Sequence, residues 1–162
     1  MTITRVEKLS YGVENMDLGT RYYRDWGLEE VESGPDHAVF RTRVGQTIEL
    51  RPAGDSTLPA TPDPAGSTLR TAVWGVQDAD GLKTMVDAVS ADREVREEDG
   101  TFLFADESGN GLGLTVAQPV ETDVSLMPIN VNPIEPRMND VIDPKAQANP
   151  IRIGHVVYAI EM

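Results

Sequence analysis

Two side chains in this sequence, an imidazole and a carboxylate on predicted strands, have the chemistry to bind a divalent metal ion. His155 opens the apolar run "HVVYAI", which is typical of a buried strand. Glu49 stands in "IEL", so strand alternation turns its carboxylate to the face opposite its apolar neighbours. Imidazole and carboxylate groups bind Fe, Mn and Zn in proteins. Since a lone histidine on an apolar strand is more often structural than a ligand, its place in the fold has to decide its role.

The overall composition is that of an acidic globular protein. Its 162 residues suit one domain or two small modules that share a core. Fourteen Lys and Arg against 27 Asp and Glu give a net charge of -13, which would repel phosphate backbones and anionic lipids. The absence of cysteine excludes disulfides, zinc–thiolate sites and thiol nucleophiles. We expect a cytoplasmic protein with neither nucleic acid nor membrane as a partner.

The elements that position these residues recur as an internal repeat. Residues 8–23 align with residues 71–86 at an offset of 63, and in each stretch an alternating strand ends in Gly-Val. Asn15 in one copy and Asp78 in the other then provide a helix N-cap. Short strands separated by turn sequences follow each predicted helix. The helices are predicted over 16–25 and 79–90, and the strands over 28–33, 37–44, 47–52, 93–98, 101–107 and 112–117.

Each copy is therefore a βαβββ module. We expect an α+β fold in which module one, about residues 1–52, and module two, about residues 68–118, form one curved mixed sheet. A Pro-rich linker is predicted over 119–150. Residues 151–162 repeat the opening strand, because Ile160 aligns with the last apolar residue of that strand, and they are expected to be the first strand of a truncated third module.

The string "RYYRDWGLE" (21–29), with a strand before it and "TIEL" (47–50) after it, resembles the vicinal oxygen chelate superfamily of glyoxalases, bleomycin-resistance proteins and type I extradiol dioxygenases. The resemblance covers nearly the whole chain. It implies that two βαβββ modules pair into a half-open cup, with metal ligands on the first and last strands of the modules. The positions it assigns to ligands are Lys8, Thr71 and His155 on first strands, and Glu49 and Gly113 on last strands.

Among the four positions of the complete module pair, only Glu49 carries a metal ligand. Lys8 is a cation and Gly113 has no side chain, so the pair cannot assemble a conventional Fe, Mn, Zn or Ni site. This pattern argues against a stand-alone glyoxalase or epimerase. It leaves Glu49 as a vestigial residue of the cup.

In lacking these metal ligands, the module pair resembles the N-terminal half of a two-domain type I extradiol dioxygenase. The resemblance implies that the N-terminal module pair has lost its metal, while the C-terminal pair holds Fe(II), or Mn(II), with two His and one Glu. His155 occupies the place of the first His. We therefore expect a parent enzyme that cleaves a catechol-like aromatic ring with O2, and neither activity nor a metal in this chain alone.

Two further expectations remain open at this stage. A metal-free small-molecule binding protein of the bleomycin-resistance type explains the losses at the ligand positions equally well. A homo-oligomer is also expected, for example through pairing of the terminal strand with another chain.

The remaining candidate residues have packing interpretations. The aromatic residues Tyr22, Tyr23 and Trp26 lie at helical spacing and are expected to pack the first helix against the sheet rather than to form a substrate box. Tyr11 and Trp74 either line the cup or occupy equivalent packing positions in the two modules. His37 is expected at the surface or at the start of a strand.

Overall fold

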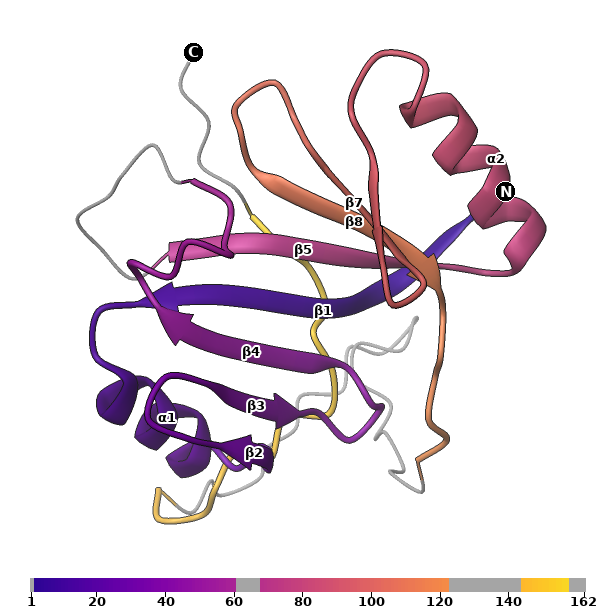
Figure 1. Cartoon of the computed structure of the whole chain (residues 1–162). Coiled ribbons are helices and arrows are strands. Elements are labelled where there is room, and N and C mark those ends of the chain that lie inside the picture. Colours follow the sequence, from indigo (N-terminus) through magenta and orange to yellow (C-terminus); the bar gives the residue numbers. More distant parts are fainter. Residues whose placement is uncertain (1, 61–67, 123–143, 158–162) are drawn as a thin grey trace.

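The structure, a computed structural model, describes residues 2–60, 68–122 and 144–157. Module one comprises β1 (Ile3–Val13), α1 (Met16–Asp25), β2 (Glu29–Ser33), β3 (Ala38–Arg41) and β4 (Thr47–Pro52). Module two comprises β5 (Thr68–Val76), α2 (Ala79–Val89), β6 (Arg96–Glu98), β7 (Thr101–Ala105) and β8 (Gly111–Val116). The two predicted βαβββ modules are confirmed, and the second helix ends one residue earlier than expected (Figure 1).

The eight strands form one mixed sheet in the order β2-β3-β4-β1-β5-β8-β7-β6. Within each module the first and last strands pair in parallel, and the first strands of the two modules, β1 and β5, pair antiparallel at the centre. The strand order is therefore the same in both modules when it is followed outward from the centre. The α+β fold expected from the repeat is confirmed.

Bulges at equivalent positions bend the two central strands. The β1–β5 register skips Thr4 and Glu7 on β1 and Arg70 on β5, and Glu7 and Arg70 lie 63 residues apart, the offset of the sequence repeat. A bulge inserts an unpaired residue, bends its strand and increases the local twist. The repeat thus extends to the irregularities that curve the sheet.

Both helices begin where the sequence places an N-cap. The Asn15 side chain accepts a hydrogen bond from the Leu18 N–H at 2.9 Å, and the Asp78 side chain accepts one from the Gly81 N–H at 2.7 Å. Helix α1 ends before Gly27, whose φ of 92° favours glycine. A Cβ at Gly27 would also lie 2.7 Å from the Asn149 Oδ1 atom, so glycine is required here twice over.

The core lies on the side of the sheet that the helices cover. Phe40 and Leu50 are fully buried there, and the Tyr23 ring packs 5.5 Å from the Phe40 ring. The expected packing against the sheet is therefore confirmed for Tyr23 and wrong for Tyr22 and Trp26, which are 58% and 43% exposed. Helix α1 is rotated so that its Met16 and Tyr23 face the sheet instead.

Tyr11 and Trp74 also pack on this helix-covered face. Tyr11 contacts the clusters built around Val13 and Leu9, and Trp74 contacts the clusters built around Leu9 and Val76. Tyr11 and Trp74 therefore occupy equivalent packing positions in the two modules, and the alternative interpretation, that they line the cup, is wrong.

The segment 144–157 returns across the helix-covered face without forming a strand. Residues 151–157 of the predicted strand 151–162 have no strand pairing, and residues 158–162 lie outside the described residues. The central strands are already paired on both sides, so the segment crosses them, and the buried Gln46 side chain holds it. Its amide donates to the Ile153 carbonyl at 3.2 Å and to the Val6 carbonyl at 2.7 Å, and its oxygen accepts from the Ile153 N–H at 2.6 Å.

The predicted linker is described at residues 119–122 and 144–150, which are irregular. Residues 123–143 of the linker, and residues 61–67 between the modules, lie outside the described residues. Residues 147–149 cap the end of α1, since the Asn149 N–H donates to the Trp26 carbonyl at 3.2 Å.

Candidate functional site

The face of the sheet opposite the helices, here called the cup face, carries the positions that the sequence singled out. Lys8 lies opposite Val73, and Ser10 lies opposite both Glu49 and Thr71. On the far side, Val73 lies opposite Gly113. Side chains directly opposite each other on paired strands project from the same face. The four positions of the complete module pair, Lys8, Thr71, Glu49 and Gly113, therefore share the cup face.

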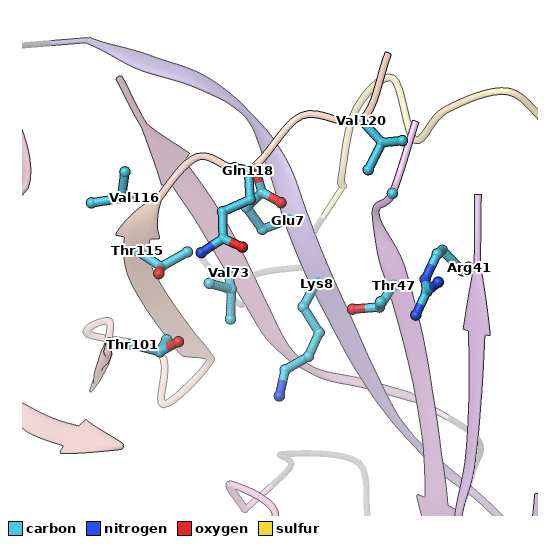
Figure 2. A pocket seen from close by; sticks show the side chains of 11 residues that line it. Glu7, Lys8, Arg41, Thr47, Val73, Thr101, Thr115, Val116, Gln118 and Val120 are labelled. Carbon is cyan, nitrogen blue, oxygen red and sulfur yellow. The ribbon is translucent and has the colours of Figure 1, made fainter. Parts of the chain in front are cut away.

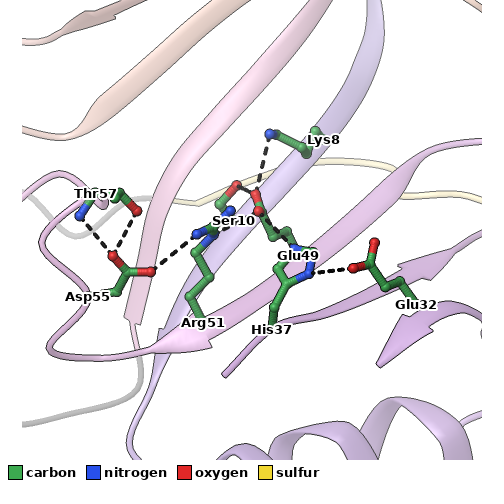
Figure 3. Close-up of polar contacts among 8 residues, drawn as sticks. All are labelled: Lys8, Ser10, Glu32, His37, Glu49, Arg51, Asp55 and Thr57. Atoms are coloured by element: carbon green, nitrogen blue, oxygen red, sulfur yellow. Dashed lines mark hydrogen bonds and ion pairs between the residues drawn. The ribbon is translucent and has the colours of Figure 1, made fainter. Parts of the chain in front are cut away.

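Glu49 is the centre of a polar network on this face (Figure 3). One carboxylate oxygen accepts from the Ser10 hydroxyl at 2.8 Å and lies 3.3 Å from the Lys8 Nζ. The other accepts from the Arg51 Nε at 2.8 Å and lies 3.3 Å from the His37 Nε2. Both oxygens are thus occupied by donors, and Glu49 is not the solvated strand residue that alternation alone suggests.

The network stabilises the ionised form of Glu49, whose side chain is only 12% exposed. Burial by itself would raise the pKa of this carboxyl group. The Lys8 charge, the Ser10 hydroxyl and the Arg51 guanidinium together outweigh burial and lower the pKa to about 2. The carboxylate therefore stays charged at neutral pH and serves as the counterion of two cations.

His37 joins this network, a role that the sequence did not indicate. It immediately precedes β3, which agrees with the expected strand start. Its Nδ1 lies 3.3 Å from a Glu32 oxygen, while its Nε2 faces Glu49. Beyond Arg51, Asp55 continues the chain of contacts at 3.3 Å. The spacing of Ser10 and Arg51, each two residues along the strand from Lys8 and Glu49, is the signal that could have placed them on the same face.

The described residues of the cup do not fit a divalent metal ion. A metal needs open lone pairs on several converging ligands, whereas Glu49 directs both oxygens at donors and its nearest strand neighbours include the Lys8 cation. Over residues 2–60, 68–122 and 144–157 there is no group of three or more His, Asp or Glu side chains that could hold a metal.

His155 lies on the segment that crosses the helix-covered face. It is exposed, two residues after Ile153, and its neighbour Val156 packs against the cluster of Val6 and Leu9. The sheet therefore separates His155 from the cup face of Glu49. Its role as a metal ligand remains a prediction.

A pocket of about 400 Å³ opens on the cup face beside this network (Figure 2). Lys8, Arg41 and Thr47 come from three neighbouring strands on one side of it, and Thr101 and Thr115 come from β7 and β8 on the other. The volume is in the range of small-molecule sites.

Known proteins resemble this chain in structure. The Mn(II)-bound glyoxalase from Novosphingobium aromaticivorans is 19% identical with a TM-score of 0.56, and the match covers 76% of this chain and 42% of the glyoxalase. The 2,3-dioxygenase LapB from Pseudomonas sp. KL28 is 16% identical with a TM-score of 0.56, covering 82% of this chain and 46% of LapB. Methylmalonyl-CoA epimerase from Mycobacterium tuberculosis is 16% identical with a TM-score of 0.50, and the match covers 72% of this chain and 90% of the epimerase.

No family model and no curated protein sequence matches the chain. The structural neighbours are members of the vicinal oxygen chelate superfamily, so the chain has the glyoxalase-like fold expected from the resemblance. It spans less than half the length of the glyoxalase and of LapB. In the described part of the chain, neither helix is long and apolar enough to cross a bilayer.

Proposed function

We propose that this chain provides the metal-free module pair of an extradiol dioxygenase, an enzyme that opens a catechol-like aromatic ring with O2. The observation that carries the proposal is the state of the cup. Three of its four ligand positions hold Lys8, Thr71 and Gly113, and the fourth, Glu49, is saturated by hydrogen-bond donors and cations. A module pair of this kind supports a catalytic pair elsewhere in the protein.

The comparisons support this proposal at the level of the fold. Solved structures similar to the chain include catechol 2,3-dioxygenase and LapB, and the chain covers 43% and 46% of them. A single module pair within a longer enzyme accounts for such coverage. Neither the activity nor the metal follows from the fold alone.

In this proposal His155 is the first metal ligand of the whole protein. The metal would be Fe(II), or Mn(II), and it would supply the Lewis-acid and redox chemistry for opening a catechol-like ring with O2. The described residues do not supply the rest of the ligand set. The part of this chain is to fold and to carry the segment that bears His155, which Gln46 fixes to the sheet. A cytoplasmic homo-oligomer remains part of the proposal.

The test compares this chain with the full product of its natural reading frame. Each is loaded anaerobically with Fe(II), the bound iron is measured, and O2 uptake is followed after addition of catechol. We expect no stoichiometric iron and no O2 uptake for residues 1–162, and one iron per chain with catechol-dependent O2 uptake for the full product.

The sequence offers a matched control for the proposed ligand, since His37 is its only other histidine. In the full product His155→Ala should abolish iron binding, whereas His37→Ala should retain it. A full product that binds no iron, or that keeps its iron after His155→Ala, contradicts the dioxygenase proposal and leaves the metal-free binding protein as the better interpretation.

A further inference from the structure

A single row of residues crosses the cup face from one module to the other. Arg41, Thr47 and Lys8 lie opposite one another on β3, β4 and β1. The row continues through Val73 on β5 and Gly113 on β8. Neighbouring strands lie about 4.8 Å apart, so the Cα atoms of Arg41 and Lys8 are roughly 10 Å apart, a gap that two long side chains can span. The row is cationic in module one and apolar in module two.

Both cations have hydrogen-bonding capacity left for another anion. The Lys8 Nζ lies 3.3 Å from a Glu49 oxygen, but that carboxylate is shared with Ser10 and Arg51, and an ammonium group has three N–H donors. The closest carboxylate oxygen to Arg41 belongs to the exposed Glu29 and is 3.9 Å away, at the limit of an ion pair. The two side chains are 44% and 42% exposed, so their head groups are accessible from the pocket.

The carboxylate that lines the pocket does not cancel these charges. Glu7 is only 12% exposed, and one of its oxygens is held by the Arg5 Nε at 3.0 Å and by the Gln118 backbone N–H at 3.1 Å. Its charge is therefore compensated locally, away from Lys8 and Arg41. In an acidic protein this leaves an unusual local excess of accessible cationic donors.

The floor of the pocket between the two cations and the hydroxyls of Thr101 and Thr115 is apolar. Val73, which lies directly opposite Lys8, forms this floor and is buried at 2% exposure. Gly113 contributes no side chain, and a Cβ there would already lie 3.0 Å from the side chains of Val73 and Leu103. These two side chains therefore close over the glycine and give the cup a low apolar floor.

We propose that this pocket binds a small organic monocarboxylate with a flat apolar body. The carboxylate lies between Lys8 and Arg41, where charge-assisted hydrogen bonds are strong and the guanidinium fork suits two oxygens. The Thr47 hydroxyl between them donates a further hydrogen bond, and the apolar body rests on Val73. The inference requires no metal and does not rest on the dioxygenase proposal, so each can fail without the other.

The experiment is an NMR titration of the ¹⁵N-labelled chain with benzoate, benzamide and acetate. Benzoate combines the anion with the ring, benzamide keeps only the ring shape, and acetate keeps only the anion. We expect benzoate to shift the amide signals of Lys8, Thr47 and Val73 in a saturable way, with a Kd of about 1 mM or tighter. Benzamide and acetate should each bind at least about tenfold more weakly, because each lacks one half of the recognition. Equal affinity for benzoate and benzamide, or benzoate shifts confined to other residues, would overturn the proposal.

Charge-matched variants distinguish the loss of a binding contact in the pocket from the general effect of removing one positive charge. Lys8→Met and Arg41→Met should each weaken benzoate binding about tenfold or more. Lys83→Met and Arg21→Met remove the same charges from exposed helix positions whose partners are Asp87 and Asp25, and should leave the affinity unchanged. Arg41→Met leaves the Glu49 network intact, so it keeps the test decisive if Lys8→Met alters the fold. A control variant that weakens binding as much as Arg41→Met refutes a defined site.

Discussion

Replacement of Glu49 by glutamine tests the electrostatic reasoning about the cup most directly. The substitution keeps the size and hydrogen-bonding shape of the side chain and removes its charge. The ordinary pKa of this carboxyl group is 4.5, and the folded protein lowers it to about 2. A shift of that size corresponds to roughly 3 kcal/mol of folding free energy at neutral pH.

The sign of the pH dependence follows from the direction of the shift. Because the pKa is lower in the folded protein, the stabilisation is fully present above the unfolded pKa of 4.5 and is lost as the pH falls toward 2. We expect Glu49→Gln to lower the free energy of unfolding by about 3 kcal/mol at pH 7, and by about 2 kcal/mol at pH 3.5. Below about pH 2 the difference should approach the cost of the altered hydrogen bonds alone.

The assay is urea unfolding of the wild type and the variant across this pH range. The difference between the two proteins isolates Glu49 from the other carboxylates, which titrate in both. Glu98→Gln is the matched control, since Glu98 is 61% exposed and pairs with Arg96 only at the surface, so it should cost less than about 0.5 kcal/mol at any pH. A Glu49→Gln cost that is small at pH 7, or that does not change with pH, would refute the role of Glu49 as a buried counterion.

Three further substitutions probe the fold around the site. Gln46→Ala should lower the free energy of unfolding by about 2–3 kcal/mol, because it leaves buried backbone groups unpaired. It should also speed hydrogen exchange at the Ile153 amide, which in the wild type donates to the Gln46 side chain. Unchanged exchange at Ile153 would mean that other contacts hold the segment. Tyr23→Ala should lower the free energy of unfolding by about 2–4 kcal/mol through lost packing, whereas Tyr22→Ala should lower it by about 1 kcal/mol or less because Tyr22 is exposed. Thermal unfolding of the two variants measures this difference. Equal losses of stability would contradict the observed rotation of α1. Asn15→Ala should lower the free energy of unfolding by about 1 kcal/mol by removing the N-cap of α1. An unchanged helical circular dichroism signal together with unchanged stability would show that the cap is dispensable.

The modules could be predicted from the sequence because the signals that begin and end their helices and strands are local. The N-caps at Asn15 and Asp78, the glycine after α1 and the repeated Gly-Val strand ends each act within a few residues. The Asp99-Gly100 turn is another example, since both residues have positive φ, as a tight hairpin requires. The offset of 63 then placed the second module from the first.

The rotation of α1 could not be predicted from spacing alone. Tyr22 and Trp26 do form a pair four residues apart, with ring centroids 5.9 Å from each other, but that spacing is the same on the exposed face of a helix as on the buried face. Burial of Met16 and Tyr23 against Phe40 and its neighbours determines the rotation, and this requires knowledge of the sheet.

The cup was predicted in part. The family resemblance placed Lys8, Glu49 and Gly113 on one face, and the strand registers put them there. The sequence could not reveal that Glu49 binds four donors, because His37 and Lys8 come from separate strands and meet it only after the sheet forms. Residues 151–157 have a strand-like sequence but form no strand here, because strand formation needs a free neighbouring edge, which the central strands do not offer.

The two edge strands have a consequence for solubility. Strands β2 and β6 are five and three residues long, every residue in them is exposed, and they carry Glu29, Glu30 and Glu32 at one edge and Glu97 and Glu98 at the other. An open sheet can grow by adding strands from a second copy, and short, charged edges oppose such growth. The excess of acidic side chains on these edges disfavours edge-to-edge pairing of two copies, so we expect a homo-oligomer to form through another surface.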